Sequence, residues 1–449
     1  MVSIKEISKF QDKKYTNHSI AFLPSLAVVS LTQDSKNQME PTVEKGDYVQ
    51  EGQIIARNCL NLSDKENCKF PAFIHSPVPG KVLDIYNVIN PNGKKLPAIL
   101  IKMEGVFSFS GKKRETLNWT YSQGNSRIKT LSQMGVINTF EKSVSLANQL
   151  NEIIKQKEKN INFITPPLVI RLFDNDPDTV IDKYISDNFA KEVFEGAAIL
   201  AGILETKDII FISDKNSWNL PDEAEIKKYL KDVQVHLLET NIDFYPRGQY
   251  KYIKQKTLQY LKSKEINKYS EIFAVDSPTC LDSYNAIAKS YPAIDKFIQI
   301  EGDDIATSGI FKIRIGTTFR SIFEECGGFI KEPAKIIING LISGIAISDL
   351  DTPITKYVKS IFVLSSRGFP DQRQTSCVRC GRCHNVCPEN LHPEKIYSNY
   401  YSDTPVKEYI LNTINLCTEC GLCNAICPSR IPLYQTINLI KGINDEQKL

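Results

Sequence analysis

Two cysteine runs near the end of the chain share one spacing. The first reads Cys-x-x-Cys-x-x-Cys-x-x-x-Cys-Pro from Cys377 to Pro388, and the second repeats it from Cys417 to Pro428. Together they hold eight of the twelve cysteines of the 449-residue chain. A cubane of four irons and four sulfides needs one thiolate per iron, and three thiolates three residues apart can come from one tight loop. The repeated spacing therefore predicts two [4Fe–4S] clusters.

The ligands of the two predicted clusters are expected to cross between the runs. This spacing is typical of two-cluster bacterial ferredoxins, in which the fourth cysteine of each run ligates the other cluster. The proline after each fourth cysteine cannot continue a helix, so it would turn the chain away from the cluster. The predicted ligand sets are Cys377, Cys380, Cys383 and Cys427 for one cluster, and Cys417, Cys420, Cys423 and Cys387 for the other.

Other uses of cysteine fit this pattern less well. Disulfides suit small secreted domains, and zinc sites usually pair two Cys-x-x-Cys units. Clusters can be structural, but two clusters that share their ligand runs favour electron transfer. Cys59 and Cys68 stand nine residues apart without histidine partners and are not expected to bind metal, whereas Cys326 is expected to be a buried apolar residue.

Composition places the chain among ordinary globular proteins. Hydrophobic residues make up 42% and charged residues 24%, and the net charge of +3 is nearly balanced, which gives no case for nucleic-acid binding. The charged N-terminus lacks the apolar core of a signal peptide. The most apolar stretches, such as Gly196–Leu204 and Ile336–Ile347, are too short or too interrupted to span a bilayer. We therefore expect an intracellular protein without its own membrane segment, and its length predicts about three domains of ordinary size.

The first region, residues 1–115, reads as β structure. Alternating apolar and polar residues surround glycines in Val43–Ile55 and in His75–Ile85, and these two blocks resemble the halves of a barrel-sandwich hybrid. Gly46 and Gly80 are expected to be turn residues with positive φ. A biotinyl or lipoyl carrier would need an exposed lysine between the halves, and Lys65 in its irregular insert fits that role poorly.

The second region, residues 116–285, alternates helices with apolar strands. That order predicts a parallel sheet with crossover helices. A ligand of such a sheet would lie at the carboxyl ends of the strands, beside a helix N-terminus. No glycine-rich loop stands at such a position. The expected helices are Glu141–Glu158, Lys191–Leu204 and Glu223–Leu230, and the expected strands are Pro166–Leu172, Asp208–Ser213 and Gln234–Leu238.

The rest of the chain divides into a β region and the cysteine region. Residues 286–350 carry strands broken by glycines and a short helix within Thr318–Gly328 that two glycines end. Residues 351–449 carry the cysteine runs, with one helix expected at Pro405–Asn415 between them and another at Ile431–Ile443 after them.

The chain as a whole resembles the C subunit of the Rnf electron transport complex. The matching motifs occur in the family's order through most of the chain and end in both cysteine runs. The resemblance implies an α/β multidomain protein: a barrel-sandwich hybrid, a complex I flavoprotein-like α/β domain, an SLBB-like β-grasp module and a helical two-cluster ferredoxin domain. The motifs are Ser30–Gln33, Glu40–Asp47, His75–Gly80, Phe244–Gly248, Ile315–Thr317 and Asp351–Lys356.

The resemblance also implies a function. The chain would be the iron–sulfur electron-transfer subunit of an ion-translocating ferredoxin:NAD oxidoreductase, a translocase. Its partners would be the other subunits of a membrane complex and a soluble ferredoxin-like or nicotinamide donor or acceptor. It would lie peripherally on the cytoplasmic face of the cell membrane. Two alternatives stay open: a soluble flavin/iron–sulfur reductase of the cobalamin-reductase type, and a non-catalytic scaffold subunit with structural clusters.

One segment departs from the family pattern. Where the family carries a glycine-rich loop for a cofactor, this chain has Gly135-Val-Ile-Asn-Thr-Phe-Glu-Lys142, with one glycine. Side chains such as Ile137 and Thr139 would stand where backbone must approach a phosphate. A second family segment appears here as Asp174–Pro177. The sequence therefore disfavours FMN without excluding it, disfavours NADH binding, and assigns no catalytic residue.

Overall fold

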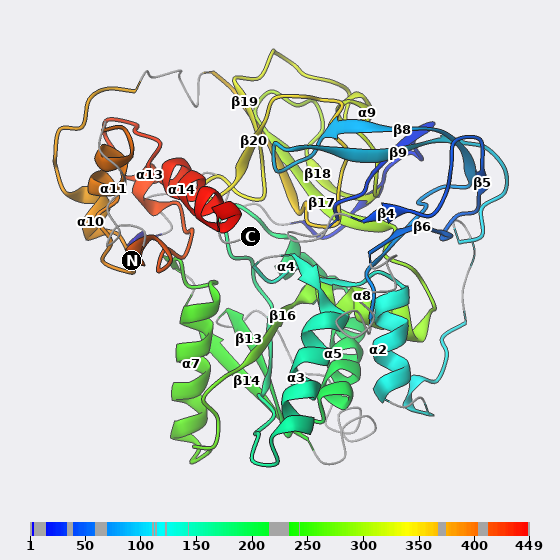
Figure 1. Ribbon diagram of the computed structural model, residues 1–449, viewed down its shortest axis with the longest axis horizontal. Coiled ribbons are helices and arrows are strands. Elements are labelled where there is room, and N and C mark those ends of the chain that lie inside the picture. The colour runs from blue at the N-terminus through cyan, green and yellow to red at the C-terminus, as the bar shows by residue number, and fades with distance from the viewer. Residues whose placement is uncertain are drawn as a thin grey trace.

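The protein is described by a computed structural model, in which four groups of elements follow one another along the chain (Figure 1). Within the described residues, no helix combines the length and apolar character that crossing a membrane requires. The structure describes residues 2–3, 15–33, 39–58, 70–109, 112, 115–121, 124–141, 143–214, 233–241, 243–366, 374–402 and 412–447.

Two small antiparallel sheets build the N-terminal region and enclose one core. Their inward side chains, among them Val29, Ile55, Ile74 and Ile99, are fully buried or nearly so. The prediction of β structure is confirmed. One sheet has the order β3-β9-β8-β5, from β3 (Leu26–Ser30), β9 (Lys95–Met103), β8 (Gly80–Ile89) and β5 (Tyr48–Val49); the other has the order β4-β6-β7, from β4 (Glu40–Pro41), β6 (Ile54–Arg57) and β7 (Phe73–His75).

The two glycines singled out in this region serve different purposes. Gly46 has φ of 102°, as expected for a turn. The same expectation for Gly80 is wrong, because Gly80 begins strand β8 and is not among the residues with positive φ. A Cβ atom there would lie 2.0 Å from the carbonyl oxygen of Lys102 on the neighbouring strand. Gly80 is therefore required for close strand approach.

The middle region contains the predicted parallel sheet, with the strand order β14-β13-β12-β16. Alternate strand residues point to two cores. One core packs against α2, α3, α5 and α8, and the other against α7. The strands are β12 (Leu168–Arg171), β13 (Asp208–Asp214), β14 (Gln234–Thr240) and β16 (Phe273–Asp276); the helices are α2 (Gly124–Gln133), α3 (Leu146–Lys159), α4 (Ile181–Asn188), α5 (Ala190–Leu204), α7 (Tyr250–Ser263) and α8 (Ser277–Ala288).

The predicted helix from Glu141 begins later than expected. Strand β11 (Val144–Ser145) pairs with β10 (Ile137–Asn138), and the Ser145 side chain then accepts a hydrogen bond from Asn148 N and caps α3. The helix predicted at Glu223–Leu230 lies outside the described residues, as do Cys59, Lys65 and Cys68.

A six-stranded mixed sheet forms the third group, and segments from far apart in the chain contribute to it. Its order is β2-β18-β17-β21-β19-β20. Helix α9 (Phe319–Glu325) packs on its core, where Cys326 is buried as predicted. Within the region where strands broken by glycines were expected, residues 335–347 form a hairpin of two antiparallel strands. The strands are β2 (Ser19–Ile20), β17 (Asp295–Gly302), β18 (Gly309–Arg314), β19 (Lys335–Ile338), β20 (Ile345–Ile347) and β21 (Ser360–Leu364).

Short helices form the C-terminal group, at the left edge of the molecule in Figure 1. They are α10 (Arg382–Asn385), α11 (Pro393–Tyr400), α13 (Leu422–Ala425) and α14 (Leu433–Gln447), which confirms the predicted final helix. Most of the helix predicted at Pro405–Asn415 lies outside the described residues. The chain's first strand, β1 (Val2–Ser3), pairs beside this group with β15 (Phe244–Tyr245), and a 3-10 turn, η2 (Trp119–Tyr121), precedes α2.

Candidate iron–sulfur centres

The two cysteine runs take the same backbone conformation. Arg379 and Glu419 occupy equivalent left-handed positions, with φ of 53° and 61°, and Gly381 and Gly421 follow with φ of 72° and 73°. A short helix begins directly after each glycine, α10 in the first run and α13 in the second. These left-handed residues wind the chain into a tight loop. The repeated sequence therefore produces a repeated local structure.

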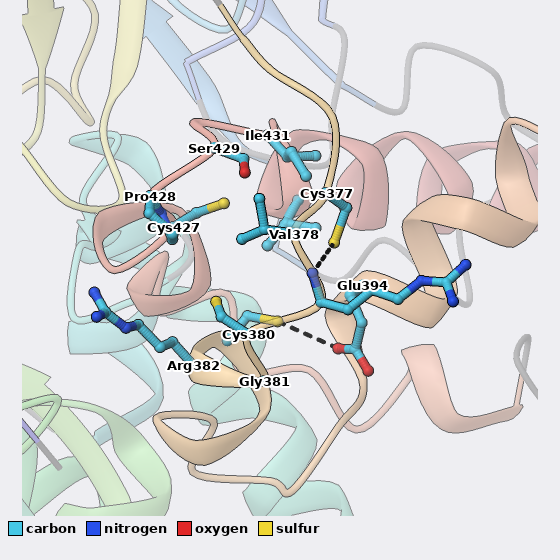
Figure 2. A pocket seen from close by; sticks show the side chains of 13 residues that line it. Cys377, Val378, Cys380, Gly381, Arg382, Glu394, Cys427, Pro428, Ser429 and Ile431 are labelled. Carbon is cyan, nitrogen blue, oxygen red and sulfur yellow. Dashed lines mark hydrogen bonds between the residues drawn. The ribbon is translucent and has the colours of Figure 1, made fainter.

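One set of four thiols surrounds a single hollow, which we call the outer site (Figure 2). Three cysteines of the first run, Cys377, Cys380 and Cys383, line it together with Cys427 of the second run. This is one of the predicted crossed sets. The hollow holds about 350 Å³ of space outside protein atoms, part of it open to solvent. Four thiols that face one hollow from different sides are the ligand number that a [4Fe–4S] cluster needs.

The other four cysteines form what we call the inner site. Cys387 of the first run lies close enough to Cys417, Cys420 and Cys423 to raise the pKa of all three thiols. Burial is the larger cause of each shift, and it raises the pKa of Cys420 to about 11. The structure therefore also brings the second predicted set together across the two runs.

The donors at both sites fit iron–sulfur clusters. Burial, followed by a hydrogen bond to Glu394, raises the pKa of Cys383 to about 12, so the bare thiol would stay protonated at neutral pH. Bound iron supplies the positive charge that holds such sulfurs as thiolates. Backbone N–H groups already point at three of the sulfurs: Arg379 N at Cys377 Sγ (3.4 Å), Glu419 N at Cys417 Sγ (3.4 Å) and Leu391 N at Cys387 Sγ (3.3 Å).

A single metal ion fits this arrangement less well. In the part of the chain that the structure describes, no three His, Cys, Asp or Glu side chains gather closely enough to hold one ion. Four thiols spaced around one hollow suit a cubane better, because a cubane places its four ligands on four separate irons.

The inner site is packed against the rest of the chain. Tyr245, buried in β15, donates a hydrogen bond to Cys420 O at 2.6 Å, and the Gln249 side chain donates one to Thr418 O at 3.0 Å. A Cβ atom on Gly421 would lie 2.3 Å from the carbonyl oxygen of Ile342, in the β19–β20 turn. The second run is thus held by the middle region on one side and by the six-stranded sheet on another.

The outer site faces solvent. Cys377 and Cys380 are exposed, and the Val378 side chain between them is 66% exposed. The neighbouring Arg379 and Arg382 are exposed as well. The two sites thus share a backbone frame and differ in their surroundings.

The carboxyl edge of the parallel sheet is filled by ion pairs of the chain itself. Arg171, at the end of β12, is fully buried and donates to Asp182 Oδ2 at 2.9 Å and to Phe140 O at 3.0 Å. Lys359, which stands just before β21, bridges Asp182 and Asp276 at 2.6 Å each. The ring of Phe140 lies 4.3 Å from the guanidinium of Arg171.

Both helix N-termini at this edge are occupied by carboxylates. Asp174 accepts hydrogen bonds from the backbone N–H groups of Asp182 and Lys183 at the start of α4. Asp276 accepts one from Thr279 N at the start of α8, at 3.0 Å. A phosphate would need these same N–H groups. Burial raises the pKa of Asp174 to about 7, whereas the charges of Lys359 and Arg171 hold the pKa of Asp276 well below its usual range.

The glycine-poor loop takes part in this closure. Thr139 donates to Asp276 Oδ2 at 2.8 Å, and Ile137 lies buried in β10. Gly135 has a left-handed backbone with φ of 67°. Its carbonyl oxygen accepts a hydrogen bond from Lys356 Nζ at 2.7 Å. The nearby His75 is buried, and burial lowers its pKa to about 3, so it is a neutral packed residue.

Sequence reasoning assigned no role to several residues that hold the inner site. Tyr245 and Gly248 belong to a recognised motif, and Gly248 O accepts a hydrogen bond from Arg171 at 2.7 Å. Their presence in a motif was the available signal. No sequence motif pointed to Ile342 or Gln249, because their contacts with the second cysteine run exist only in the folded chain.

The fold and the two sets of thiols define an iron–sulfur protein in which a two-cluster ferredoxin-like region is joined to a barrel-sandwich hybrid and an α/β region. Residues 5–106 match the RnfC barrel sandwich hybrid domain, and residues 372–431 match the 4Fe-4S dicluster domain. The resemblance of this chain to the C subunit of Rnf complexes is thereby confirmed, and curated relatives extend it over most of the chain.

Three of those relatives, each the C subunit of its complex, illustrate the extent of the match. The one from the proton-translocating ferredoxin:NAD(+) oxidoreductase complex of Clostridium ljungdahlii is 28% identical, with 86% of this chain and 81% of that protein covered. The one from the ion-translocating oxidoreductase complex of Rhodobacter capsulatus is 24% identical, over 85% and 70%. The one from the Na(+)-translocating complex of Acetobacterium woodii is 23% identical, over 83% and 81%. Among solved structures, an NAD+-reducing [NiFe]-hydrogenase is 12% identical with a TM-score of 0.47, over 74% of this chain and 64% of that one.

Proposed function

We propose that this chain is the iron–sulfur electron-transfer subunit of an ion-translocating, Rnf-type oxidoreductase complex. The observation that carries the proposal is the pair of crossed four-cysteine sites, each with three thiols of one run and the last thiol of the other. When bound, the clusters would accept and release single electrons. The similarity to C subunits named for ferredoxin:NAD(+) oxidoreductase complexes supports the assignment to such an assembly.

The surroundings of the two sites favour a path in which electrons pass through the two clusters one after the other. The inner site lies against the α/β region through Tyr245 and Gln249, whereas the outer site reaches solvent through Cys377 and Cys380. Electrons would therefore pass between the body of the protein and an external partner by way of the inner and then the outer cluster, or in the reverse order.

The domain division that we propose keeps the sequence boundaries with one change. Regions 1–115 and 116–285 stay as expected, the latter as a complex I flavoprotein-like domain. The SLBB-like β-grasp module would start at 286 and extend past residue 350 to Leu364, since β21 pairs with β17 and β19 inside the six-stranded sheet. The ferredoxin domain would then follow.

We further propose that the α/β region binds neither FMN nor NADH at its sheet edge. Asp174 and Asp276 already accept the N–H groups at the starts of α4 and α8, and the Arg171–Asp182–Lys359 ion pairs fill the space between. A phosphate brought here would meet buried carboxylates. In this chain the region would serve to position the inner site.

The subunit would sit peripherally on the cytoplasmic face of the cell membrane, held by partner subunits. The absence of a spanning helix in the described residues fits this placement. A high-salt or chaotrope wash of membranes should then release the chain, because a docked interface can be competed away. Retention in the lipid fraction without partners would contradict it.

The direct test is metal analysis of anaerobically purified protein. Two cubanes require about eight irons and about eight acid-labile sulfides per chain. Dithionite should bleach both clusters, NADH alone should not, and denatured protein should release no FMN. About four irons per chain would refute the two-cluster assignment. Stoichiometric FMN together with rapid reduction of the clusters by NADH would refute only the proposal that the α/β region binds neither FMN nor NADH. Clusters that are present but not reduced by a carrier protein would favour the scaffold alternative.

A further inference from the structure

We propose that Thr418 sets the reduction potential of the inner cluster, through a hydrogen bond from its hydroxyl group to a sulfur at that site. The inference rests on the proposed function, because it names a residue that tunes one of the two proposed clusters. Val378 occupies the equivalent position in the first run and has no hydrogen-bond donor in its side chain. The two runs therefore provide an internal comparison.

The folded loops place these two side chains at equivalent points of the two sites. Val378 lines the hollow of the outer site, and its side chain stands among the labelled cysteines in Figure 2. The next residues, Arg379 and Glu419, have φ of 53° and 61°, so the two backbones match. Thr418 is thereby placed against the inner site as Val378 is placed against the outer one.

The Thr418 hydroxyl oxygen is buried and has no hydrogen-bond partner among the described residues. The backbone at this point is held in place, since the Thr418 carbonyl oxygen accepts a hydrogen bond from Gln249 Nε2 at 3.0 Å. Folded proteins rarely leave a buried hydroxyl group without a partner. A cluster bound at the inner site would supply the acceptor, because cluster and thiolate sulfurs accept hydrogen bonds.

Cys420 is the ligand whose sulfur this hydroxyl group affects. Burial raises the pKa of the Cys420 thiol to about 11, and the Thr418 hydroxyl group acts against that rise. It is therefore close enough to stabilise negative charge on the Cys420 sulfur. The same contact would stabilise the charge that reduction adds to a cluster held by this sulfur.

The burial of the inner site makes such stabilisation necessary. Cys420 packs against Tyr245 and Leu422, so negative charge at this site is poorly solvated. An electron that arrives from the outer cluster leaves that cluster oxidised and adds one negative charge at the inner site, while the Thr418 proton stays on its oxygen. Hydrogen bonds donated to the sulfurs favour the reduced state. Thr418 would thus offset part of the effect of burial and keep the two clusters close enough in potential to exchange electrons.

A second pair of equivalent positions differs in the same direction. Glu394 lines the outer hollow, with one carboxylate oxygen 3.2 Å from Cys383 Sγ. The residue at the same distance after the second run is Tyr434. Burial raises the pKa of Tyr434 to about 12, so its phenol group stays protonated at neutral pH. The inner site thus has two hydroxyl-bearing residues where the outer site has an apolar side chain and a carboxylate.

The test is a redox titration of the full anaerobic holoprotein, followed by electron paramagnetic resonance. The signal that Cys387→Ser removes identifies the inner cluster. Thr418→Val replaces the hydroxyl group by a methyl group. It should disfavour reduction of the inner cluster by about tenfold, which is about 59 mV for one electron. The potential of the outer cluster should not change, and iron should stay at about eight per chain.

Matched variants separate the hydroxyl group from its surroundings. Thr418→Ser keeps the donor and should keep most of the inner potential. Val378→Thr adds a hydroxyl group at the outer site, where the side chain is 66% exposed and water already supplies donors, so its shift should be the smaller one. Thr130→Val removes a threonine hydroxyl group from α2, far from the cysteine runs (Figure 1), and should change neither potential.

Each outcome decides the proposal. An unchanged inner potential in Thr418→Val overturns it, as does an equal fall in Thr418→Ser, which would assign the effect to side-chain shape. An equal shift of both clusters overturns it as well. If Thr418→Val does not retain the inner cluster, Thr418→Ala removes the hydroxyl group with less disturbance, and an unchanged potential there is again a contradiction. A wild type with about four irons per chain or fewer would instead refute the proposed function.

Discussion

The outer and inner sites are two copies of one loop in two different surroundings. Arg379 and Glu419, like Gly381 and Gly421, have nearly equal φ angles, so the local backbone is the same. The inner copy is held by Tyr245, Gln249 and the Ile342 carbonyl group, whereas the outer copy leaves two of its thiols exposed. The comparison teaches that a short-range sequence pattern can build a cluster loop, while contacts with distant segments determine whether that loop faces the protein or its partner.

The largest expected effect concerns the crossed ligands. Cys387→Ser should remove the inner cluster, and Cys427→Ser should remove the outer one, because each thiol lies with the other run's cysteines. Iron should fall from about eight to about four per chain in each variant. Electron paramagnetic resonance of the reduced protein would show which signal survives. Loss of the cluster within the mutated cysteine's own run would disprove the crossing.

A matched pair of glycine substitutions tests the difference in packing. Gly381→Ala and Gly421→Ala both place a side chain at a left-handed position, which costs about 1–2 kcal/mol. Only Gly421→Ala also drives a Cβ atom against Ile342 O, whereas nothing lies within 4 Å at Gly381. Overpacking adds roughly 1–3 kcal/mol. Anaerobic denaturation should therefore show the larger loss for Gly421→Ala, accompanied by loss of the inner signal. Equal losses would mean that the inner loop is not held where we describe it.

Solvent access should make the clusters differ in chemical durability. Cys377 and Cys380 are exposed, whereas Cys420 is buried. Oxidants and iron chelators should therefore remove the outer cluster first, and the inner signal should persist. A time course of both resonance signals during chelation would measure this order. Simultaneous loss would indicate that one opening event exposes both sites.

The smallest expected effect concerns the charge beside each site. An oxygen of Glu394 lies 3.2 Å from Cys383 Sγ. Glu394→Gln therefore removes a negative charge next to the outer cluster and should raise its reduction potential by tens of millivolts, on the order expected for one nearby charge. Glu419→Gln is the matched change in the inner run, where Lys441 already offsets the carboxylate. Potentiometric titration should show the smaller shift there.

Several features could be predicted because they depend on neighbours in sequence. The cysteine spacing indicated both loops, and the alternation of strands and helices indicated the parallel sheet. The missing glycines at 135–142 disfavoured a phosphate site there, and this stays a prediction. Capping, by contrast, was missed: Ser145 starts α3 later than the apolar periodicity suggested, because the preceding residues pair as a strand.

The tertiary structure alone decided how these parts meet. Gly80 is a glycine because β9 approaches it, not because a turn needs it. Lys359 seals a sheet edge formed by residues more than eighty positions earlier, and β21 joins a sheet across a boundary drawn at 350. The first cysteine run is exposed and the second is buried, and this difference likewise depends on distant residues such as Tyr245 and Ile342. Spacing in sequence determines local backbone geometry, but burial and charge pairing are set by residues that are distant in sequence and become neighbours only on folding.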